Sequence, residues 1–348
     1  MNLINQNTFR RTPIINLRVI NVTIILFILS VIFSGCFIES KEQILFTQGN
    51  SIYIVDSDGN NLKKIVSPNS NTSPSWSPKY DQILFITASN TIASVNRDKL
   101  DEIQIYQEFN QNLPISNLQW SPNARYISFN AENNIRIFDI SSSEEILNLK
   151  GYSHHNWSRD SEWIAISSSD IDSGGIIQRN PLGVNELKRT TDPTHFAPQW
   201  SPSNEKLAFL KSDGEVNDLY IMDLSSKSES NEAILLYKGL SLDTTYSWSP
   251  NGKEIAFTSA NNSENNDEIY SINIESLETK RLTINSNKSD RNPVWSPDGS
   301  RIAFISSKEG QNETLVFAAY IMNDDGTRQE KITEYSLENQ TLGWYAHN

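Results

Sequence analysis

The sequence contains almost no cysteine: Cys36 is the only one among 348 residues. An intrachain disulfide is therefore impossible. The fold must be stabilised by packing and hydrogen bonding without covalent crosslinks.

Basic residues are also scarce, with 29 Lys and Arg against 42 Asp and Glu. Three of the arginines, Arg10, Arg11 and Arg18, lie in the first 36 residues, which contain no acidic residue. The remainder carries a formal charge of about −16 with neutral histidine. Nucleic acid is therefore not expected as a partner, because binding its phosphates requires clustered Lys and Arg.

Long apolar runs are absent except for one, VINVTIILFILSVIF at residues 19–33. Its 15 residues suit the hydrophobic region of an export signal and fall short of the roughly 20 that span a bilayer. The run leads into Phe33-Ser34-Gly35-Cys36, which resembles a bacterial lipobox, although Phe33 stands where Leu is usual.

The resemblance implies a lipoprotein signal peptide at residues 1–35, lipidation of Cys36 and a short tether at 36–42. The alternative is an uncleaved anchor that uses residues 19–38 as a span. On either interpretation the rest of the chain is exported and membrane-anchored, facing the periplasm or the cell exterior.

What the sequence does contain is a phrase that begins with Trp-Ser and recurs six times. The intervals between successive tryptophans of this repeat, from Trp76 to Trp344, are 44, 37, 43, 48, 47 and 49 residues. Trp163 does not belong to the repeat. Such a period is typical of four-stranded propeller blades rather than of helical repeats. The tryptophans on the register are Trp76, Trp120, Trp157, Trp200, Trp248, Trp295 and Trp344.

The phrase predicts a tight turn between two strands. In Ser296-Pro-Asp-Gly299, Pro fixes φ at the second position of a type I turn, and Gly supplies the positive φ that often closes such a hairpin. Large and small apolar residues alternate after the turn, as in Ile-Ala-Phe-Ile at 302–305. This pattern suits a sheet that is covered on both faces.

Two further strands follow in each unit. The third ends in Asp or Asn, as at 51–56, 135–139, 218–223, 268–273 and 319–323, and a short fourth follows, as at 280–283 and 330–333. Four strands per unit, short turns and no helical pattern predict an all-β fold, a β-propeller of four-stranded antiparallel blades.

The two ends of the repeat region decide the blade count. Residues 43–66 contain strands two to four of a unit without a Trp strand, and residues 342–348 contain a Trp strand alone. We therefore predict that the N- and C-terminal strands pair in one blade, which gives seven blades over residues 43–348 and removes exposed sheet edges. Six blades with a loose end are the alternative.

The succession of Trp-Ser-Pro-Asp-Gly, Ile-Ala-Phe, Ile-Tyr-Met-Asp-like strands and Arg-Leu-Thr resembles the repeat of the TolB-type, WD40-like propeller family over nearly all of the chain after the leader. TolB itself carries an α/β domain before a six-bladed propeller, whereas this chain passes from Cys36 into a strand within about ten residues. Similar propellers cap prolyl-oligopeptidase-type enzymes, but the chain has no Gly-x-Ser-x-Gly elbow, so serine peptidase activity is not expected.

Any site is expected on the face formed by the segments that precede the Trp strands. Polar clusters occur there at 69–74, 154–156, 192–195 and 288–291. His154, His155 and His195 belong to adjacent units and could together hold a divalent metal near the channel mouth. Oligogalacturonate lyases, which are propellers of similar repeat, hold a metal through histidines. The alternative is that these histidines bond neighbouring loops or face solvent.

These observations favour a non-enzymatic binding module for a protein, peptide or glycan, with no cofactor. A metal-dependent, lyase-like carbohydrate-active enzyme that uses the three histidines is the alternative. The sequence does not predict an oligomeric state.

Overall fold

The computed structural model describes residues 42–49, 51–66, 74–79, 81–108, 115–168, 170, 174–225, 232–260, 266–337 and 342–345. They belong to one compact unit, Glu42–Asn348. The leader and Cys36 lie outside the described residues. No helix within the described ranges has the length and apolarity needed to cross a membrane.

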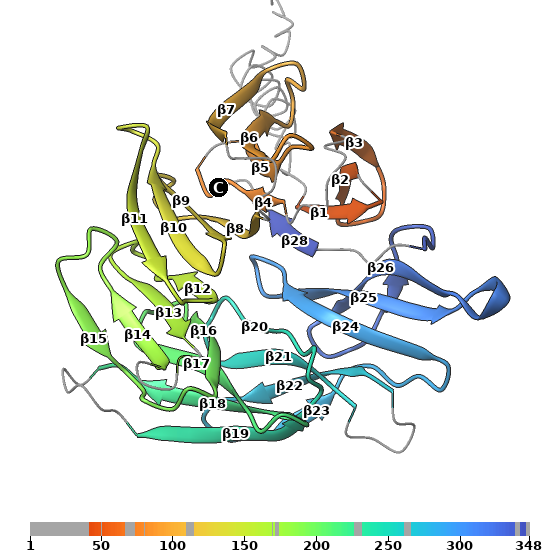
Figure 1. Cartoon of the computed structure of the whole chain (residues 1–348). Coiled ribbons are helices and arrows are strands. Elements are labelled where there is room, and N and C mark those ends of the chain that lie inside the picture. The colour runs from red at the N-terminus through yellow and green to blue at the C-terminus, as the bar shows by residue number, and fades with distance from the viewer. Residues whose placement is uncertain are drawn as a thin grey trace, which may run out of the picture. The chain divides into compact units, whose positions relative to one another are not determined.

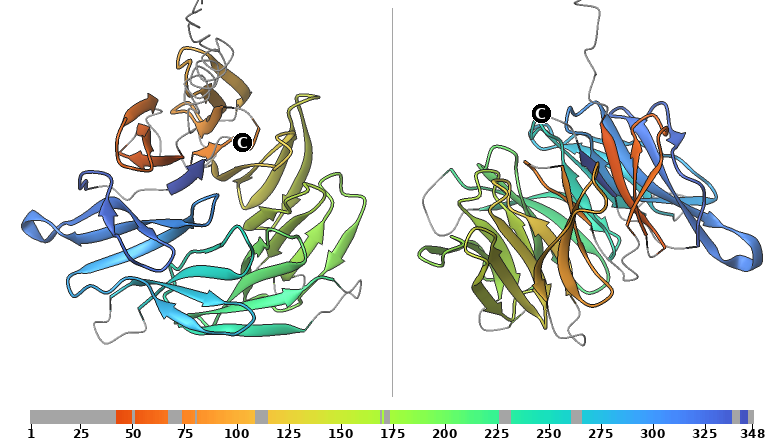
Figure 2. Two further views of the ribbon diagram at one scale, coloured as in Figure 1. Left: turned by 180° about the vertical axis from the view of Figure 1, so that it is seen from behind. Right: turned by 90° about the horizontal axis from the view of Figure 1, so that it is seen from above.

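Seven four-stranded antiparallel sheets follow one another around a ring in chain order (Figures 1 and 2). Blade 1 combines β28 (Leu342–Tyr345) with β1 (Gln43–Gln48), β2 (Ser51–Asp56) and β3 (Lys63–Val66). Blade 2 contains β4 (Ser75–Trp76), β5 (Gln82–Ile86), β6 (Thr91–Asn96) and β7 (Ile103–Glu108). Blade 3 contains β8 (Ile115–Trp120), β9 (Tyr126–Ala131), β10 (Asn134–Asp139) and β11 (Glu144–Lys150).

The second half of the ring repeats this plan. Blade 4 contains β12 (His154–Trp157), β13 (Ile164–Ser168), β14 (Gly175–Arg179) and β15 (Glu186–Lys188). Blade 5 contains β16 (His195–Trp200), β17 (Lys206–Ser212), β18 (Asn217–Asp223) and β19 (Ala233–Leu240). Blade 6 contains β20 (Tyr246–Trp248), β21 (Glu254–Ser259), β22 (Glu268–Asn273) and β23 (Thr279–Arg281). Blade 7 contains β24 (Lys288–Trp295), β25 (Arg301–Glu309), β26 (Leu315–Asn323) and β27 (Glu330–Lys331), with a short 3-10 turn, η1 (Gln311–Glu313), between β25 and β26.

The predicted seven-bladed architecture is confirmed, including its closure. In blade 1, β28 pairs antiparallel with β1 over four residues. The composite blade therefore joins the first and last described strands, and the six-bladed alternative is wrong.

The core lies between the blades. A phenylalanine in the second strand of six blades is at most 1% exposed, namely Phe46, Phe85, Phe129, Phe209, Phe257 and Phe304. One cluster joins Ala208 and Leu210 of blade 5 to Ile255 and Phe257 of blade 6. The alternation of large and small residues lets each sheet pack closely against the next, as the sequence pattern indicated.

The serine of the repeated phrase supports the turn through its side chain, a role that the sequence analysis did not assign. In five turns its hydroxyl oxygen accepts a hydrogen bond of 2.9 to 3.0 Å from the backbone N–H five residues later. These serines, at most 3% exposed, are Ser121, Ser158, Ser201, Ser249 and Ser296. In four of the turns the hydroxyl also donates to the Asp or Asn two residues on, as Ser296 does to Asp298 at 2.6 Å.

The predicted turn geometry is confirmed as well. The backbone N–H of Gly299 donates to the Ser296 carbonyl at 2.9 Å, and Gly299 has a φ of +74°. The turn closes at a positive φ, which residues with a side chain rarely adopt. Glycine therefore suits this position.

Candidate functional site

The turns that follow the Trp strands surround a cavity at one mouth of the channel. Its volume is about 870 Å³, and it takes residues from six of the seven blades. We call it the channel-mouth cavity. It is lined by Trp76, Ser77, Pro78, Arg159, Pro202, Ser203, Trp248, Pro250, Asn251, Pro297 and Trp344.

Three of the seven repeat tryptophans supply its aromatic wall. Trp76, Trp248 and Trp344 are partly exposed, whereas Trp120, Trp157, Trp200 and Trp295 are at most 7% exposed between blades. The indole N–H of Trp248 donates to the Gln199 carbonyl at 3.3 Å, and that of Trp344 donates to the Val294 carbonyl at 2.9 Å. Both indoles are thus fixed by the preceding blade before any ligand arrives.

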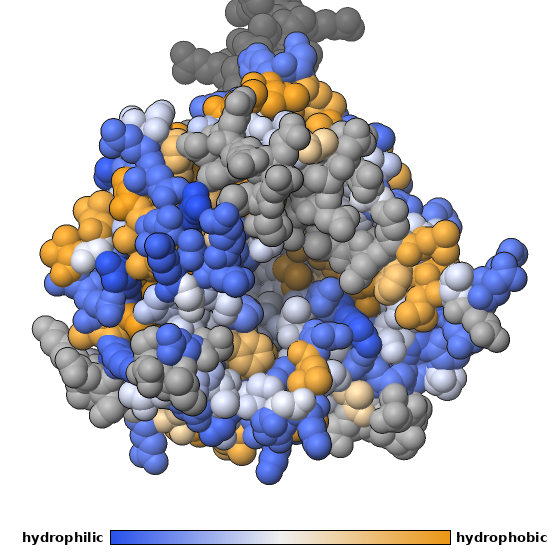
Figure 3. Space-filling view, viewed as in Figure 1, coloured by the Kyte–Doolittle hydropathy of each residue, from blue (hydrophilic) through white to orange (hydrophobic). Residues whose placement is uncertain are grey.

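The sequence analysis expected a site on the opposite face, where segments precede the Trp strands. That face carries two cavities of about 580 Å³ each. The first lies between blades 4 and 5, and its lining includes His154, His195 and Phe196. Figure 3 shows the face seen in Figure 1, which is largely hydrophilic and hollowed near the centre of the ring.

His154 and His195 therefore share one cavity. Nδ1 of His154 lies 2.9 Å from Ser153 Oγ, and the His154 ring packs 5.5 Å from the Phe196 ring. Nε2 of His195 lies 3.6 Å from Asp192 Oδ2, and its ring packs 4.8 Å from that of Phe209. Burial lowers the pKa of both imidazoles, although Asp192 opposes the effect at His195.

His155 does not line this cavity. Successive side chains of a strand point to opposite faces, and the Nδ1 atom of His155 lies 3.3 Å from Asn117 Nδ2 in blade 3. Burial first, and then the nearby His154, lower the pKa of His155 to about 3. Within the described part of the chain, no group of three His, Cys, Asp or Glu side chains is close enough to hold a metal ion.

Two other predicted polar clusters have different outcomes. Residues 69–73 of the first lie outside the described residues. In the second, Lys288 lies 5.1 Å from the centre of the Tyr320 ring, and Arg291 forms an ion pair with Asp267. Lys288 and Ser289 line the second cavity of this face.

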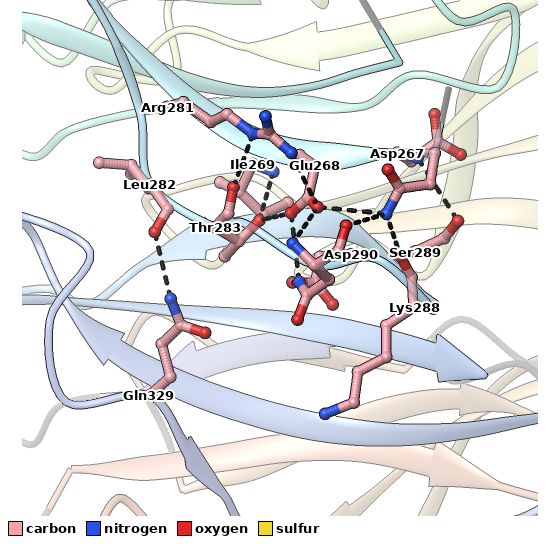
Figure 4. Close-up of polar contacts among 12 residues, drawn as sticks. Asp267, Glu268, Ile269, Arg281, Leu282, Thr283, Lys288, Ser289, Asp290 and Gln329 are labelled. Atoms are coloured by element: carbon pink, nitrogen blue, oxygen red, sulfur yellow. Dashed lines mark hydrogen bonds and ion pairs between the residues drawn. The ribbon is translucent and has the colours of Figure 1, made fainter. Parts of the chain in front are cut away.

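Beside that cavity lies a buried acidic network that joins Asp290, from the predicted cluster at 288–291, to Glu268, which no sequence motif indicated (Figure 4). Glu268 of β22 is fully buried and accepts hydrogen bonds from Arg281, Thr283 and Asn285. Asn285 also donates to Asp290 of β24 at 2.7 Å, which links blades 6 and 7. Both carboxylate oxygens of Glu268 thus accept hydrogen bonds from neighbouring residues of the protein.

The electrostatics of this network single out Asp290, which is 1% exposed. Burial raises the pKa of Asp290 to about 6, and the charge of Glu268 adds to the rise, while polar contacts that include the hydrogen bond from Asn285 limit it. A carboxyl that is driven toward its neutral form by desolvation follows the usual behaviour of buried acids.

Comparison with known proteins decides the family. A family model described as the TolB beta propeller domain matches residues 154–343, more than half of the chain. The chain belongs to the TolB beta-propeller family. A second model, the WD40 domain of anaphase-promoting complex subunit 4, matches residues 74–166. No curated protein matches the chain.

Solved structures share the fold of this TolB-type propeller at low identity. TolB from Acinetobacter baumannii is 17% identical with a TM-score of 0.52, covering 86% of this chain and 81% of that one. An oligogalacturonate lyase solved in complex with manganese is 12% identical with a TM-score of 0.59, covering 84% of this chain and 86% of that one. At such identities the likeness extends to the fold alone, because one propeller architecture hosts unrelated functions.

Proposed function

We propose that this TolB-type propeller is an exported, membrane-tethered binding module that docks a protein, peptide or glycan partner and performs no chemistry. The observation that carries the proposal is the channel-mouth cavity. Its wall combines three partly exposed indoles with proline turns from several blades.

The physical basis is preorganisation. The turns are fixed by their buried serines, and the Trp248 and Trp344 indoles are held by backbone carbonyls of the preceding blades. Binding to rigid groups costs little conformational entropy, and aromatic anchors in a concave site dominate the energy of most interfaces.

The placement of the histidines supports this proposal over the lyase-like alternative. His154 and His195 line one cavity, whereas the ring of His155 contacts blade 3. Among the described residues, no group of three His, Cys, Asp or Glu side chains lies close enough to hold a metal ion, which supports the binding module over the lyase-like alternative.

Site-specific photo-crosslinking in the cells that make the protein tests the proposal. A photoreactive phenylalanine replaces Ser203, an exposed residue of the cavity wall, and a matched control replaces Glu144, which is exposed on the outermost strand β11 of blade 3. We expect one recurrent partner to be captured through position 203 and not through position 144. Capture at neither position, or equal capture at both, would contradict docking at the cavity.

A further inference from the structure

One blade departs from the repeat at the channel mouth. Five turns carry proline after the Trp-Ser pair, namely Pro78, Pro122, Pro202, Pro250 and Pro297, whereas blade 4 carries Arg159 at this position. The Arg159 side chain is exposed and lines the cavity. It is the only charged side chain among the described residues that form the wall.

The backbone of Arg159 is fixed by the next blade. Its N–H donates to Asn204 Oδ1 at 2.7 Å. The adjacent carboxylate, Asp160, is already engaged, since it accepts from Ser158 Oγ at 2.6 Å, from the backbone N–H of Glu162 at 2.9 Å and from Asn204 Nδ2 at 3.0 Å. Asp160, the acidic residue nearest to Arg159 in the sequence, therefore already has hydrogen-bond partners within the turn and in Asn204.

The guanidinium of Arg159 has no hydrogen-bond or ion-pair partner among the described residues. Seven other arginines in the described ranges form ion pairs with carboxylates, namely Arg97, Arg125, Arg136, Arg179, Arg281, Arg291 and Arg301. In a chain with 42 acidic residues against 29 basic ones, partners for arginine are plentiful. A free guanidinium inside a cavity therefore suits an anion supplied from outside.

We infer that the channel-mouth cavity binds an acidic peptide segment whose carboxylate pairs with Arg159. The inference rests on the proposed function and adds the chemistry of the partner. A planar guanidinium matches one carboxylate through two parallel hydrogen bonds, and a single cation suits one carboxylate better than a densely charged phosphate chain.

The rest of the wall favours a peptide over an acidic glycan. Trp and Pro rings offer flat apolar contacts that suit extended, proline-containing peptides. Groups that could bond the many hydroxyls of a sugar are few, and the side-chain oxygen of Asn251 already accepts from Ser249 Oγ at 2.8 Å and from the Lys253 N–H at 2.9 Å.

The test uses the full-length protein in detergent micelles and an array of proline-containing dodecapeptides that each carry Asp or Glu. Every peptide is paired with its Asn or Gln counterpart. We expect wild type to bind the acidic member of each binding pair with about tenfold higher affinity. This is the gain in affinity that one hydrogen bond to a charged group usually gives. Arg159→Gln should abolish the preference, and so should Arg159→Pro, which restores the residue of the other turns. Arg328→Gln, an exposed arginine outside the cavity wall, is the charge-matched control and should retain it.

Three results would overturn the inference: no preference in wild type, a preference that persists in Arg159→Gln, or Arg159-dependent binding of a uronic-acid oligosaccharide in place of acidic peptides. The photo-crosslink at position 203 separates this failure from failure of the proposed function. A partner captured equally by wild type and Arg159→Gln would leave docking intact and remove the role of Arg159.

Discussion

Trp344 of β28 lies directly opposite Ile44 of β1 in the register that closes the ring. The Trp344 indole donates to the Val294 carbonyl of blade 7 at 2.9 Å, so this residue also joins blade 1 to its neighbour. Closure thus depends on a strand of four residues that supplies the inner edge of blade 1.

Removing the closing strand should therefore weaken the whole ring. We expect Trp344→Ala to lower the free energy of unfolding by roughly 2–4 kcal/mol through loss of apolar packing, and deletion of residues 342–348 to lower it further. Urea denaturation followed by circular dichroism measures both. Leu337→Ala, at a side chain that is 69% exposed, is the control and should change little. An unchanged midpoint in the deletion variant would rule out a stabilising role for the closure.

The buried serine of each turn should be worth more than its small size suggests. Ser296→Ala leaves the Arg301 N–H without its acceptor and removes one of the donors to Asp298, which keeps its hydrogen bonds from Ser300, so we expect a loss of about 1–2 kcal/mol. Ser286→Ala, at an exposed serine, should cost nothing measurable. Equal midpoints for the two variants in denaturant titrations would show that the hydroxyl does not hold the turn.

Asp290 should make stability depend on pH. Its pKa is raised from an ordinary 3.8 to about 6, so between these values the folded state binds the proton that the unfolded state has lost. This contribution to stability is therefore lost as the pH rises through the window, and the loss is complete above about pH 6.

The neutral variant Asp290→Asn isolates this effect. We expect its stability relative to wild type to increase by about 2 kcal/mol between pH 4 and pH 7.5, as the wild-type carboxyl ionises in a buried site beside Glu268. Denaturation in urea at several pH values provides the measurement. The comparison with wild type cancels the opposite contribution of His155, whose pKa is lowered by burial to about 3. A difference that stays constant with pH would show that Asp290 is ionised throughout.

Lipidation of Cys36 is tested by Cys36→Ser. If the lipobox interpretation is right, the variant loses incorporation of labelled palmitate and leaves the membrane fraction or accumulates as uncleaved precursor. Cell fractionation and intact-protein mass spectrometry distinguish these products. A full-length, uncleaved wild-type chain without acyl mass would instead support the anchor at residues 19–38.

Much of the fold was predictable because each blade repeats the same local chemistry. The turn at Ser296 and the alternation around Phe304 depend on neighbours within a few residues, so they can be recognised in the sequence. The blade count could also be predicted. Residues 43–66 supply strands two to four of a blade without a Trp strand, and residues 342–348 supply a Trp strand alone. The buried role of the serine was not foreseen, because a hydroxyl in a turn gives no sign of its burial.

The candidate site was harder to predict because it depends on which side chains meet across blades. His154 and His155 are adjacent in the sequence, yet the strand sends their rings in opposite directions. The interruption of the proline series by Arg159 is visible in the sequence, but only the ring shows that this residue faces a cavity with Trp76, Trp248 and Trp344.

The sequence by itself determined the strands, the turns, the period and hence the seven-bladed propeller, because hydrogen bonding and packing within a blade are local and repeated. The tertiary structure alone decided that Glu268 and Asp290 share a buried network, that the His155 ring contacts blade 3, and that the Arg159 guanidinium has no partner among the described residues. Those relationships arise from the packing of one blade against the next, where distance along the chain no longer indicates distance in space.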